Sequence, residues 1–150
     1  MTPSRGAVGP GSCRVRTFEA ADEPGVIALW ERVFPDDRPW NAAAAIVRRK
    51  TAIRDTLFWI AETDGRVIGA VMAGWDGQRG WIYHLAVEPE RRRHGVGRAL
   101  VETVEARLAR LGCPKINLQV QATNADVVAF YERLGYRTEP RISMGKTVAR

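Results

Sequence analysis

Cysteine is scarce in this sequence, which has only Cys13 and Cys113 among its 150 residues. The two lie far apart and show none of the spacing of a zinc site, so we expect no metal cofactor. So few thiols also exclude a small domain held together by several disulfides. A reducing, cytoplasmic setting is the simplest interpretation, and a single disulfide between the two cysteines is the alternative.

Long apolar runs are missing as well. No stretch is long enough to cross a bilayer, and the first 13 residues, MTPSRGAVGPGSC, lack the apolar centre of a secretory signal. We therefore expect no membrane partner. Residues 1–12 are expected to form a flexible leader, because they offer little apolar surface to offset the entropy cost of ordering. Residues 13–150 have the size of one domain.

Acidic residues are outnumbered: 17 Asp and Glu stand against 23 Lys and Arg, a formal net charge of +6. This balance favours anionic partners, and by charge alone nucleic acid, an anionic membrane surface and phosphorylated small molecules all remain possible. The apolar share of 45% and the charged share of 27% are those of ordinary folded domains. Composition therefore argues against disorder over most of the chain.

The common phosphate-binding motifs are also absent. There is no GxxxxGK[ST], which argues against a P-loop nucleotide hydrolase, and no GxGxxG followed by an acidic residue, which argues against a dinucleotide-binding fold. The chain has instead PERRRHGVGRAL, from Pro89 to Leu100, at the point where a strand-like run gives way to helical periodicity.

This junction has the chemistry of an anion site. The first turn of a helix has amide N–H groups without intrahelical partners, and the helix dipole adds partial positive charge there. Gly95 and Gly97 have no Cβ, so a phosphate can approach the main chain closely. Arg92, Arg93 and Arg98 can add side-chain charge. A surface turn whose arginines are merely solvated is the alternative.

Hydrophobic periodicity predicts a mixed α/β domain with no internal repeat. The pair Asp64-Gly65 between two apolar runs is a strong hairpin signal, and Asp22 is the expected cap of the first helix. The expected order is a strand at 13–18, helices at 23–34 and 42–53, strands at 57–63, 66–75 and 81–87, a helix at 97–111 ended by Gly112, a strand at 115–121, a helix at 124–134 opened by Asn124 and closed by Gly135, and strands at 136–140 and 141–148.

A second candidate stretch is NADVVAFYERLGY, from Asn124 to Tyr136. In the expected helix Tyr131 falls near the edge of the apolar face, where its hydroxyl needs a hydrogen-bond partner if it is buried. Tyr131 is either a proton donor or a core residue that bonds outward.

Together these two stretches resemble the GNAT superfamily of N-acetyltransferases. The family hallmark, Arg/Gln-x-x-Gly-x-Gly/Ala after the fourth strand, is met by Arg92, Gly95 and Gly97, and Asn124 followed by FYERLGY matches a later motif. The resemblance is strongest over residues 81–136. From Arg14 onward the chain is similar to the small bacterial YpeA-type members through the stretches LWER, RPWN and GCPKI.

The resemblance implies the GNAT fold: a central, mostly antiparallel twisted sheet of six to seven strands, with strands four and five splayed, flanked by about four helices. It implies acetyl-CoA as the donor and co-substrate. The pyrophosphate of the donor would be held by the main-chain amides of one loop, made of Arg92, Arg93, His94, Gly95, Val96, Gly97 and Arg98.

The resemblance also assigns roles along the rest of the donor. The backbone of Leu85, Ala86 and Val87 would bond the pantetheine arm, with one N–H polarising the thioester carbonyl. Asn124 would face the pantetheine from the other side, and Tyr131 would be the general acid that protonates the leaving thiolate.

The chain departs from the family pattern at two positions. Many members have glycine where this chain has Arg93, and we expect the extra cation to strengthen phosphate binding. Some relatives have a glutamate base where this chain has Gln119, whose amide cannot accept a proton usefully near neutral pH. The general base is thus not identified. His84 is interpreted as packing, because strand alternation puts it opposite Tyr83.

The fragment DDRPWN follows the first expected helix, a region that borders the acceptor in GNAT proteins. Asp36, Asp37 and Trp40 could bind a cationic amine by charge and cation–π contact. The alternative is a turn capped by Asn41, with Trp40 packed.

The leading hypothesis is direct acetyl transfer from acetyl-CoA to an amine acceptor, which is a small molecule, a peptide N-terminus or a lysine. A non-catalytic CoA-binding sensor on the same fold is the alternative, since fold does not determine function. PERRRHGVGR lacks the signatures of nucleic-acid recognition, so we expect no nucleic-acid partner. The expected oligomeric state is a monomer or a homodimer.

Overall fold

The computed structural model describes residues 13–35 and 38–148. The expected leader, residues 1–12, and the pair Asp36 and Asp37 lie outside the described residues. The chain divides into two compact units, Met1–Leu118 and Gln119–Arg150. The expectation that residues 13–150 form a single domain stays a prediction.

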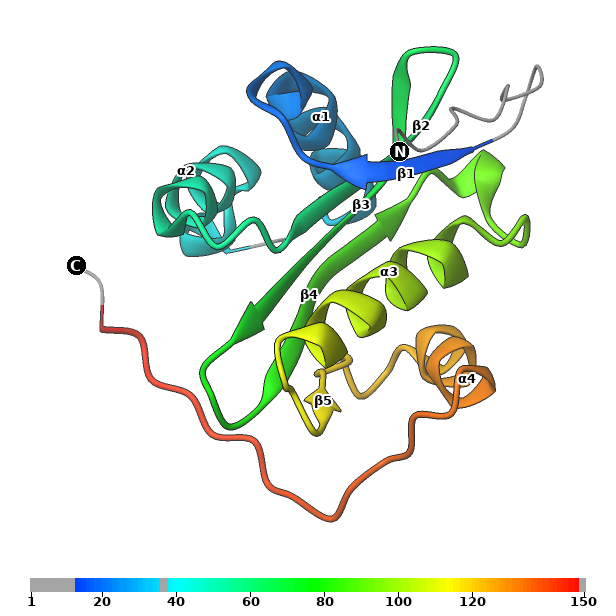
Figure 1. The fold of residues 1–150 in the computed structure, drawn as a ribbon. Coiled ribbons are helices and arrows are strands. Elements are labelled where there is room, and N and C mark those ends of the chain that lie inside the picture. The colour runs from blue at the N-terminus through cyan, green and yellow to red at the C-terminus, as the bar shows by residue number, and fades with distance from the viewer. Residues whose placement is uncertain (1–12, 36–37, 149–150) are drawn as a thin grey trace. The chain divides into compact units, whose positions relative to one another are not determined.

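A five-stranded sheet forms the centre of the first unit, with its strands in chain order (Figure 1). Neighbours among the first four strands are antiparallel, and β5 runs parallel to β4. The turn between β2 and β3 has φ 50° at Asp64 and φ 71° at Gly65, the left-handed pair that an Asp-Gly hairpin needs. The mixed α/β class is thus confirmed. The strands are β1 Arg14–Thr17, β2 Phe58–Thr63, β3 Arg66–Trp75, β4 Gly80–Val87 and β5 Ile116–Asn117.

Helices cover both faces of this sheet (Figure 1). On one face α1 (Glu23–Val33) and α2 (Ala43–Ile53) share an apolar cluster with β2, β3 and β4. On the other face lies α3 (Val96–Arg110), with its apolar stripe fully buried. Gly69 permits the close approach of α3, because a Cβ there would lie 3.0 Å from Leu100 Cδ1. Three short 3-10 turns are η1 (Ala20–Asp22), η2 (Pro39–Asn41) and η3 (Pro89–Arg91).

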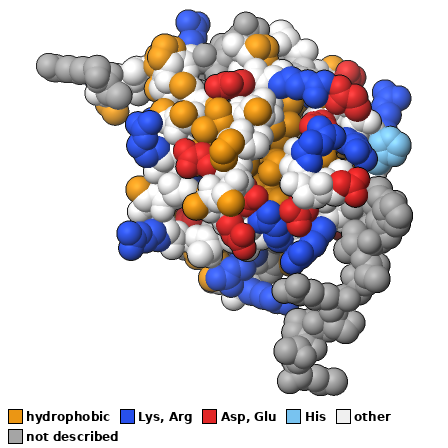
Figure 2. Space-filling model, turned by 90° about the horizontal axis from the view of Figure 1, so that it is seen from above, with side chains coloured by type: hydrophobic (Ala, Val, Ile, Leu, Met, Phe, Trp, Pro, Cys, Tyr) orange, Lys and Arg blue, Asp and Glu red, His pale blue; other side chains and the backbone are white. Residues whose placement is uncertain are grey.

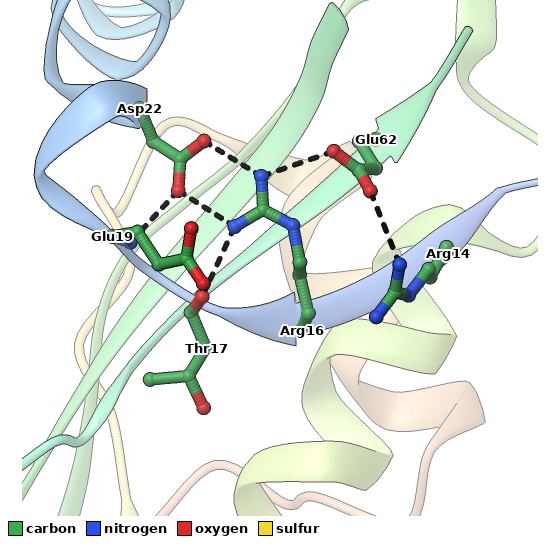
Figure 3. A network of polar contacts seen from close by, with 6 residues as sticks. All are labelled: Arg14, Arg16, Thr17, Glu19, Asp22 and Glu62. Atoms are coloured by element: carbon green, nitrogen blue, oxygen red, sulfur yellow. Dashed lines mark hydrogen bonds and ion pairs between the residues drawn. The ribbon is translucent and has the colours of Figure 1, made fainter. Parts of the chain in front are cut away.

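A partly buried ion-pair network joins β1 to β2 and to the start of α1 (Figure 3). The guanidinium of Arg16 donates to both carboxylate oxygens of Asp22 at 2.8 Å and to Glu62 Oε2 at 3.0 Å. Asp22 also accepts from the Glu19 N–H at 2.8 Å. Its carboxylate therefore caps η1 and binds Arg16, and makes no side-chain cap bond to α1, which corrects the predicted role of Asp22.

The second unit contains α4 (Ala125–Arg133) and an irregular C-terminal segment. Asn124 caps α4 as predicted, since its Oδ1 accepts from the Val127 N–H at 3.3 Å. Gly135 follows the helix with φ 94°, the left-handed conformation expected at a helix end.

The prediction of six to seven strands was too high. The expected strand at 115–121 is regular only over Ile116–Asn117, and the stretches 136–140 and 141–148 form no strand in the described part of the chain. Ile142, Met144 and Val148 are 90%, 91% and 84% exposed. Alternating apolar residues specify which face of a strand is buried, but they do not supply the neighbouring edge that a ladder needs.

Candidate active site

One edge of β4 is open over most of its length. β5 pairs with β4 only at Gly80 and Trp81, and among the described residues no strand pairs with the outer edge of β4 beyond that point. The segment Leu85–Val87 lies on this open stretch, while β3 occupies its other edge at Ala86 and Val87. An unpaired edge offers a row of main-chain donors and acceptors to an extended, amide-containing ligand.

A β-bulge interrupts β4 just before this segment. Ala70 pairs with Ala86 and Met72 pairs with Tyr83, so two residues of β4, His84 and Leu85, lie opposite one residue of β3. His84 has φ 51°, a conformation uncommon for a residue with a Cβ. A bulge bends its strand and redirects the backbone groups that follow, here those of Leu85.

The loop after β4 leads into the N-terminus of α3. Arg92 Nε donates to the Val87 carbonyl at 3.3 Å, so the loop is fastened to the end of the open strand. Gly95 precedes the helix with φ 82°, where any other side chain would be strained. The first backbone bond of the helix runs from the Ala99 N–H to the Gly95 carbonyl at 3.0 Å.

The amides of residues 96–98 therefore have no acceptor within α3 and are available to an anion. Nearby side chains add positive charge unevenly. Arg98 is drawn to Glu102 at 3.1 Å, whereas the Arg93 guanidinium forms no ion pair with a described residue. Arg93 has φ 66°, in the left-handed region. The exposed guanidinium of Arg93 thus adds positive charge next to Arg92, the residue that binds the Val87 carbonyl.

A cleft of about 970 Å³ borders this loop and the first turn of α3. Its lining includes Arg66 and Arg91, but Arg66 is paired with the buried Glu88 at 2.7 Å. Seen from above, basic and acidic side chains are interspersed around a central apolar area (Figure 2). On this face the described side chains thus show both signs of charge.

In the second unit, Tyr131 is the buried residue of α4, with 7% of its surface exposed. Its ring meets those of Phe130 and Tyr136 edge-on, with centroids 5.0 and 5.5 Å away. Burial raises the pKa of Tyr131 above its usual value near 10, because the charged phenolate is poorly solvated there. Tyr131 thus keeps its proton at neutral pH.

A sequence model of the acetyltransferase (GNAT) family matches residues 22–136. This chain belongs to the GNAT family. It is 42% identical over 132 residues to acetyltransferase ECA0875 of Pectobacterium atrosepticum, covering 88% of this chain and 93% of that protein. It is therefore an N-acetyltransferase that depends on acetyl-CoA, as the resemblance of its motifs indicated.

Solved structures of two other acetyltransferases share the fold of this GNAT protein. AAC(6')-Iy, in complex with a bisubstrate analogue of CoA and acetylneamine, matches with a TM-score of 0.75 and 16% identity, over 92% of this chain and 99% of that one. Glucosamine-6-phosphate N-acetyltransferase from Arabidopsis thaliana matches with a TM-score of 0.69 and 22% identity, over 92% and 99%. Identities this low establish the fold and no more.

The first unit of the GNAT chain brings two groups of predicted donor residues together. Leu85–Val87 and the loop Arg92–Arg98 are adjoining, linked by the bond from Arg92 to Val87. Asn124 and Tyr131 share α4 of the second unit. Their roles toward acetyl-CoA stay predictions.

The predicted position of His84 opposite Tyr83 was wrong, although its packing role agrees with the structure. Met72 belongs to the cluster under α1 and α2, so its partner Tyr83 faces that side. The His84 ring also lies against that side, with its centroid 5.1 Å from that of Trp30 in α1 and 5.2 Å from that of Phe34, which follows the helix. The bulge brings two successive side chains to one face, and alternation cannot foresee a bulge.

The acceptor side of the GNAT enzyme is less completely described. Trp40 lies in η2 and is 47% exposed, but Asp36 and Asp37 are outside the described residues, so the cation-binding group stays a prediction. Gln119 Nε2 donates to Ser143 Oγ at 2.7 Å and offers no basic group. The described residues contain no group of three or more side chains suited to a metal ion. No helix among them is long and apolar enough to cross a membrane.

Proposed function

We propose that this GNAT enzyme transfers the acetyl group of acetyl-CoA directly to an amine, without a covalent enzyme intermediate. The observation that carries the proposal is the continuity of the donor site. The open edge of β4 passes, through the Arg92–Val87 bond, into the glycine-opened N-terminus of α3. An extended amide arm that ends in a pyrophosphate suits both parts in that order.

The pyrophosphate binds the amides at the start of α3. The amides of residues 96–98 lack intrahelical acceptors, and the helix dipole favours an anion there. Gly95 and Gly97 keep side chains away from the phosphate oxygens, and Arg93 adds the exposed cation. Hydrogen bonds from several N–H groups together offset the free energy of removing water from the phosphates, as at other helix termini that bind phosphate.

The pantetheine arm and the thioester lie along Leu85–Val87. Amide groups of the arm exchange hydrogen bonds with the open edge, as an added strand would. A main-chain N–H next to the bulge polarises the thioester carbonyl, so that charge developing on its oxygen in the tetrahedral transition state is stabilised. Asn124 keeps its amide NH₂ as a donor to the arm, because only its Oδ1 is used in capping.

Tyr131 acts as the general acid. As the amine attacks the carbonyl carbon, the C–S bond breaks and negative charge grows on sulfur. Tyr131 is fully protonated at neutral pH because burial raises its pKa, and its hydroxyl hydrogen passes to that sulfur as the C–S bond breaks. The nitrogen that has bonded the carbonyl carbon gives up one proton to water, and water returns a proton to the Tyr131 oxygen, so that the products are the amide and the free thiol of CoA. The acceptor must be a neutral amine when it attacks, since only the unprotonated nitrogen has its electron pair available.

The acceptor class is a small-molecule amine, a peptide N-terminus or a lysine side chain. We further propose a cytoplasmic enzyme that acts as a monomer or homodimer and has no nucleic-acid or membrane partner. The free state of Cys13 and Cys113 is consistent with a reducing compartment.

An acetyl-CoA turnover screen against an amine library, read by CoA release and by mass spectrometry of the product, tests the function. Several amines are expected to show turnover, and one to show it best. Tight CoA binding without turnover on any amine would instead identify a non-catalytic sensor and contradict the proposal.

Tyr131→Phe tests the general acid, with Tyr136→Phe as the matched control in the same unit. Removing the Tyr131 hydroxyl should lower kcat by about 10²-fold and change the Kd of acetyl-CoA by less than about threefold. The control, whose ring packs on Tyr131 at 5.5 Å, should keep kcat within about threefold of wild type. Equal losses in kcat and in donor affinity for Tyr131→Phe would place the hydroxyl in binding alone.

A further inference from the structure

Trp30 makes a hydrogen bond that joins α1 to the bulge of β4. It lies on α1 with 1% of its surface exposed, and its ring stacks on Phe58 at 5.6 Å. Its one polar atom, Nε1, donates to the main-chain carbonyl of His84 at 3.1 Å, across 54 positions of sequence. A buried indole N–H needs an acceptor, and this one finds it at the bulge of β4.

The acceptor residue has an unusual backbone. His84 is the bulged residue with φ 51°, and an L-residue persists in that region only where its surroundings hold it there. α1 and the residue that ends it hold His84 in two ways: the rings of Trp30 and Phe34 contact its side chain, and the Trp30 N–H binds its carbonyl. Of these contacts, only the hydrogen bond from the Trp30 N–H acts on the main chain of His84.

We propose that Trp30 is a positioning residue for acetyl transfer: its indole N–H holds His84 in the left-handed conformation and thereby aims the backbone of Leu85–Val87 at the thioester. The proposal rests on the proposed function, in which that backbone meets the donor. The held carbonyl belongs to the residue directly before Leu85, so a rotation of the His84 backbone would turn the next N–H away from its direction.

The geometry distinguishes this role from core packing. Phenylalanine could fill most of the space of the Trp30 ring and stack on Phe58, but it has no N–H. An aromatic residue chosen for packing alone would leave the His84 carbonyl without its bond to α1. If the main-chain N–H that polarises the thioester carbonyl is displaced by a fraction of an ångström, binding of the transition state weakens more than binding of the ground state.

Trp30→Phe is the decisive variant, and Phe34→Leu is its matched control, because both change a ring against His84 but only the first removes the hydrogen bond. Trp30→Phe should lower kcat about tenfold and leave KM for acetyl-CoA within about twofold, whereas Phe34→Leu should keep both within about twofold. Adding His84→Gly to Trp30→Phe should restore kcat to within about threefold of wild type, since glycine adopts positive φ without support.

Hydrogen exchange of a peptide covering residues 80–88, measured without substrate, gives a readout independent of turnover. Exchange should be about tenfold faster in Trp30→Phe than in wild type and unchanged in Phe34→Leu. Unchanged exchange in Trp30→Phe, equal losses of kcat in both variants, or no recovery with His84→Gly would overturn the proposal. A wild-type protein without turnover would refute the proposed function, while the exchange experiment would still decide whether Trp30 holds the bulge.

Discussion

Arg93 allows the backbone and the charge of the loop Arg92–Arg98, the proposed pyrophosphate site, to be tested separately. Its φ of 66° lies in the left-handed region, where many GNAT members have glycine. In the left-handed region a residue with a Cβ is less stable in the folded state than glycine by about 1–2 kcal/mol. The greater conformational entropy of glycine in the unfolded state offsets about 0.5–1 kcal/mol of this advantage. Arg93→Gly should therefore be more stable than Arg93→Ala by about 0.5–1 kcal/mol.

Chemical and thermal unfolding monitored by circular dichroism would measure this difference, which corresponds to a Tm about 2 °C higher for the glycine variant. Both variants lose the cation, so both should bind CoA about tenfold more weakly than wild type at low salt, and the gap should narrow as salt is added. Isothermal titration calorimetry at two salt concentrations measures it.

Two outcomes would contradict the expected roles of Arg93. Equal stability of Arg93→Gly and Arg93→Ala would show that the left-handed backbone carries no cost at this position. An unchanged CoA affinity in both variants would remove Arg93 from phosphate binding and leave the main-chain amides as the whole of the anion site. Arg93→Lys, which keeps the charge, is the control for the second part.

Two further predictions concern the scaffold. Arg16 holds the pKa of the Asp22 carboxyl below its usual range, so the pair stabilises the fold above the unfolded-state pKa of about 4, and this stability is lost as pH falls through the lowered folded-state pKa. Asp22→Asn should cost about 2 kcal/mol in urea unfolding at pH 7, and the gap to wild type should shrink toward pH 3; a gap that is constant with pH would contradict the ion-pair account. Gly80→Ala should cost about 1–3 kcal/mol, because its Cβ would lie 2.8 Å from Leu108 Cδ1, while Gly145→Ala, whose Cβ would meet nothing within 4 Å, should be nearly neutral in the same assay.

Local signals were reliable where the chain itself sets the geometry. Asp64-Gly65 predicted the hairpin because few other pairs adopt positive φ at two successive positions. Asn124 predicted the start of α4, and glycines predicted the helix ends, because caps are satisfied within a few residues. The turn into α3 was predicted in the same way, since Gly95 and Gly97 lie within a few residues of the helix start; its role toward the donor stays a prediction.

Signals failed where a partner far along the chain decides the outcome. Asp22 was expected to cap α1, but Arg16 and η1 take its carboxylate. The apolar alternation in 136–148 predicted strands that the described residues do not form. The indole N–H of Trp30 donates to the carbonyl of His84, 54 residues away, and no feature of the sequence identifies that acceptor.

The sequence by itself determined the family, the α/β class and the glycine-opened start of α3, because all three depend on short motifs whose backbone preferences are local. Only the tertiary structure decided the open edge of β4 and its bulge at His84, because strand pairing and the bond from Trp30 join segments that are distant in the chain. The φ preferences of single residues set the geometry of a loop, whereas long-range hydrogen bonds set the direction of a strand edge.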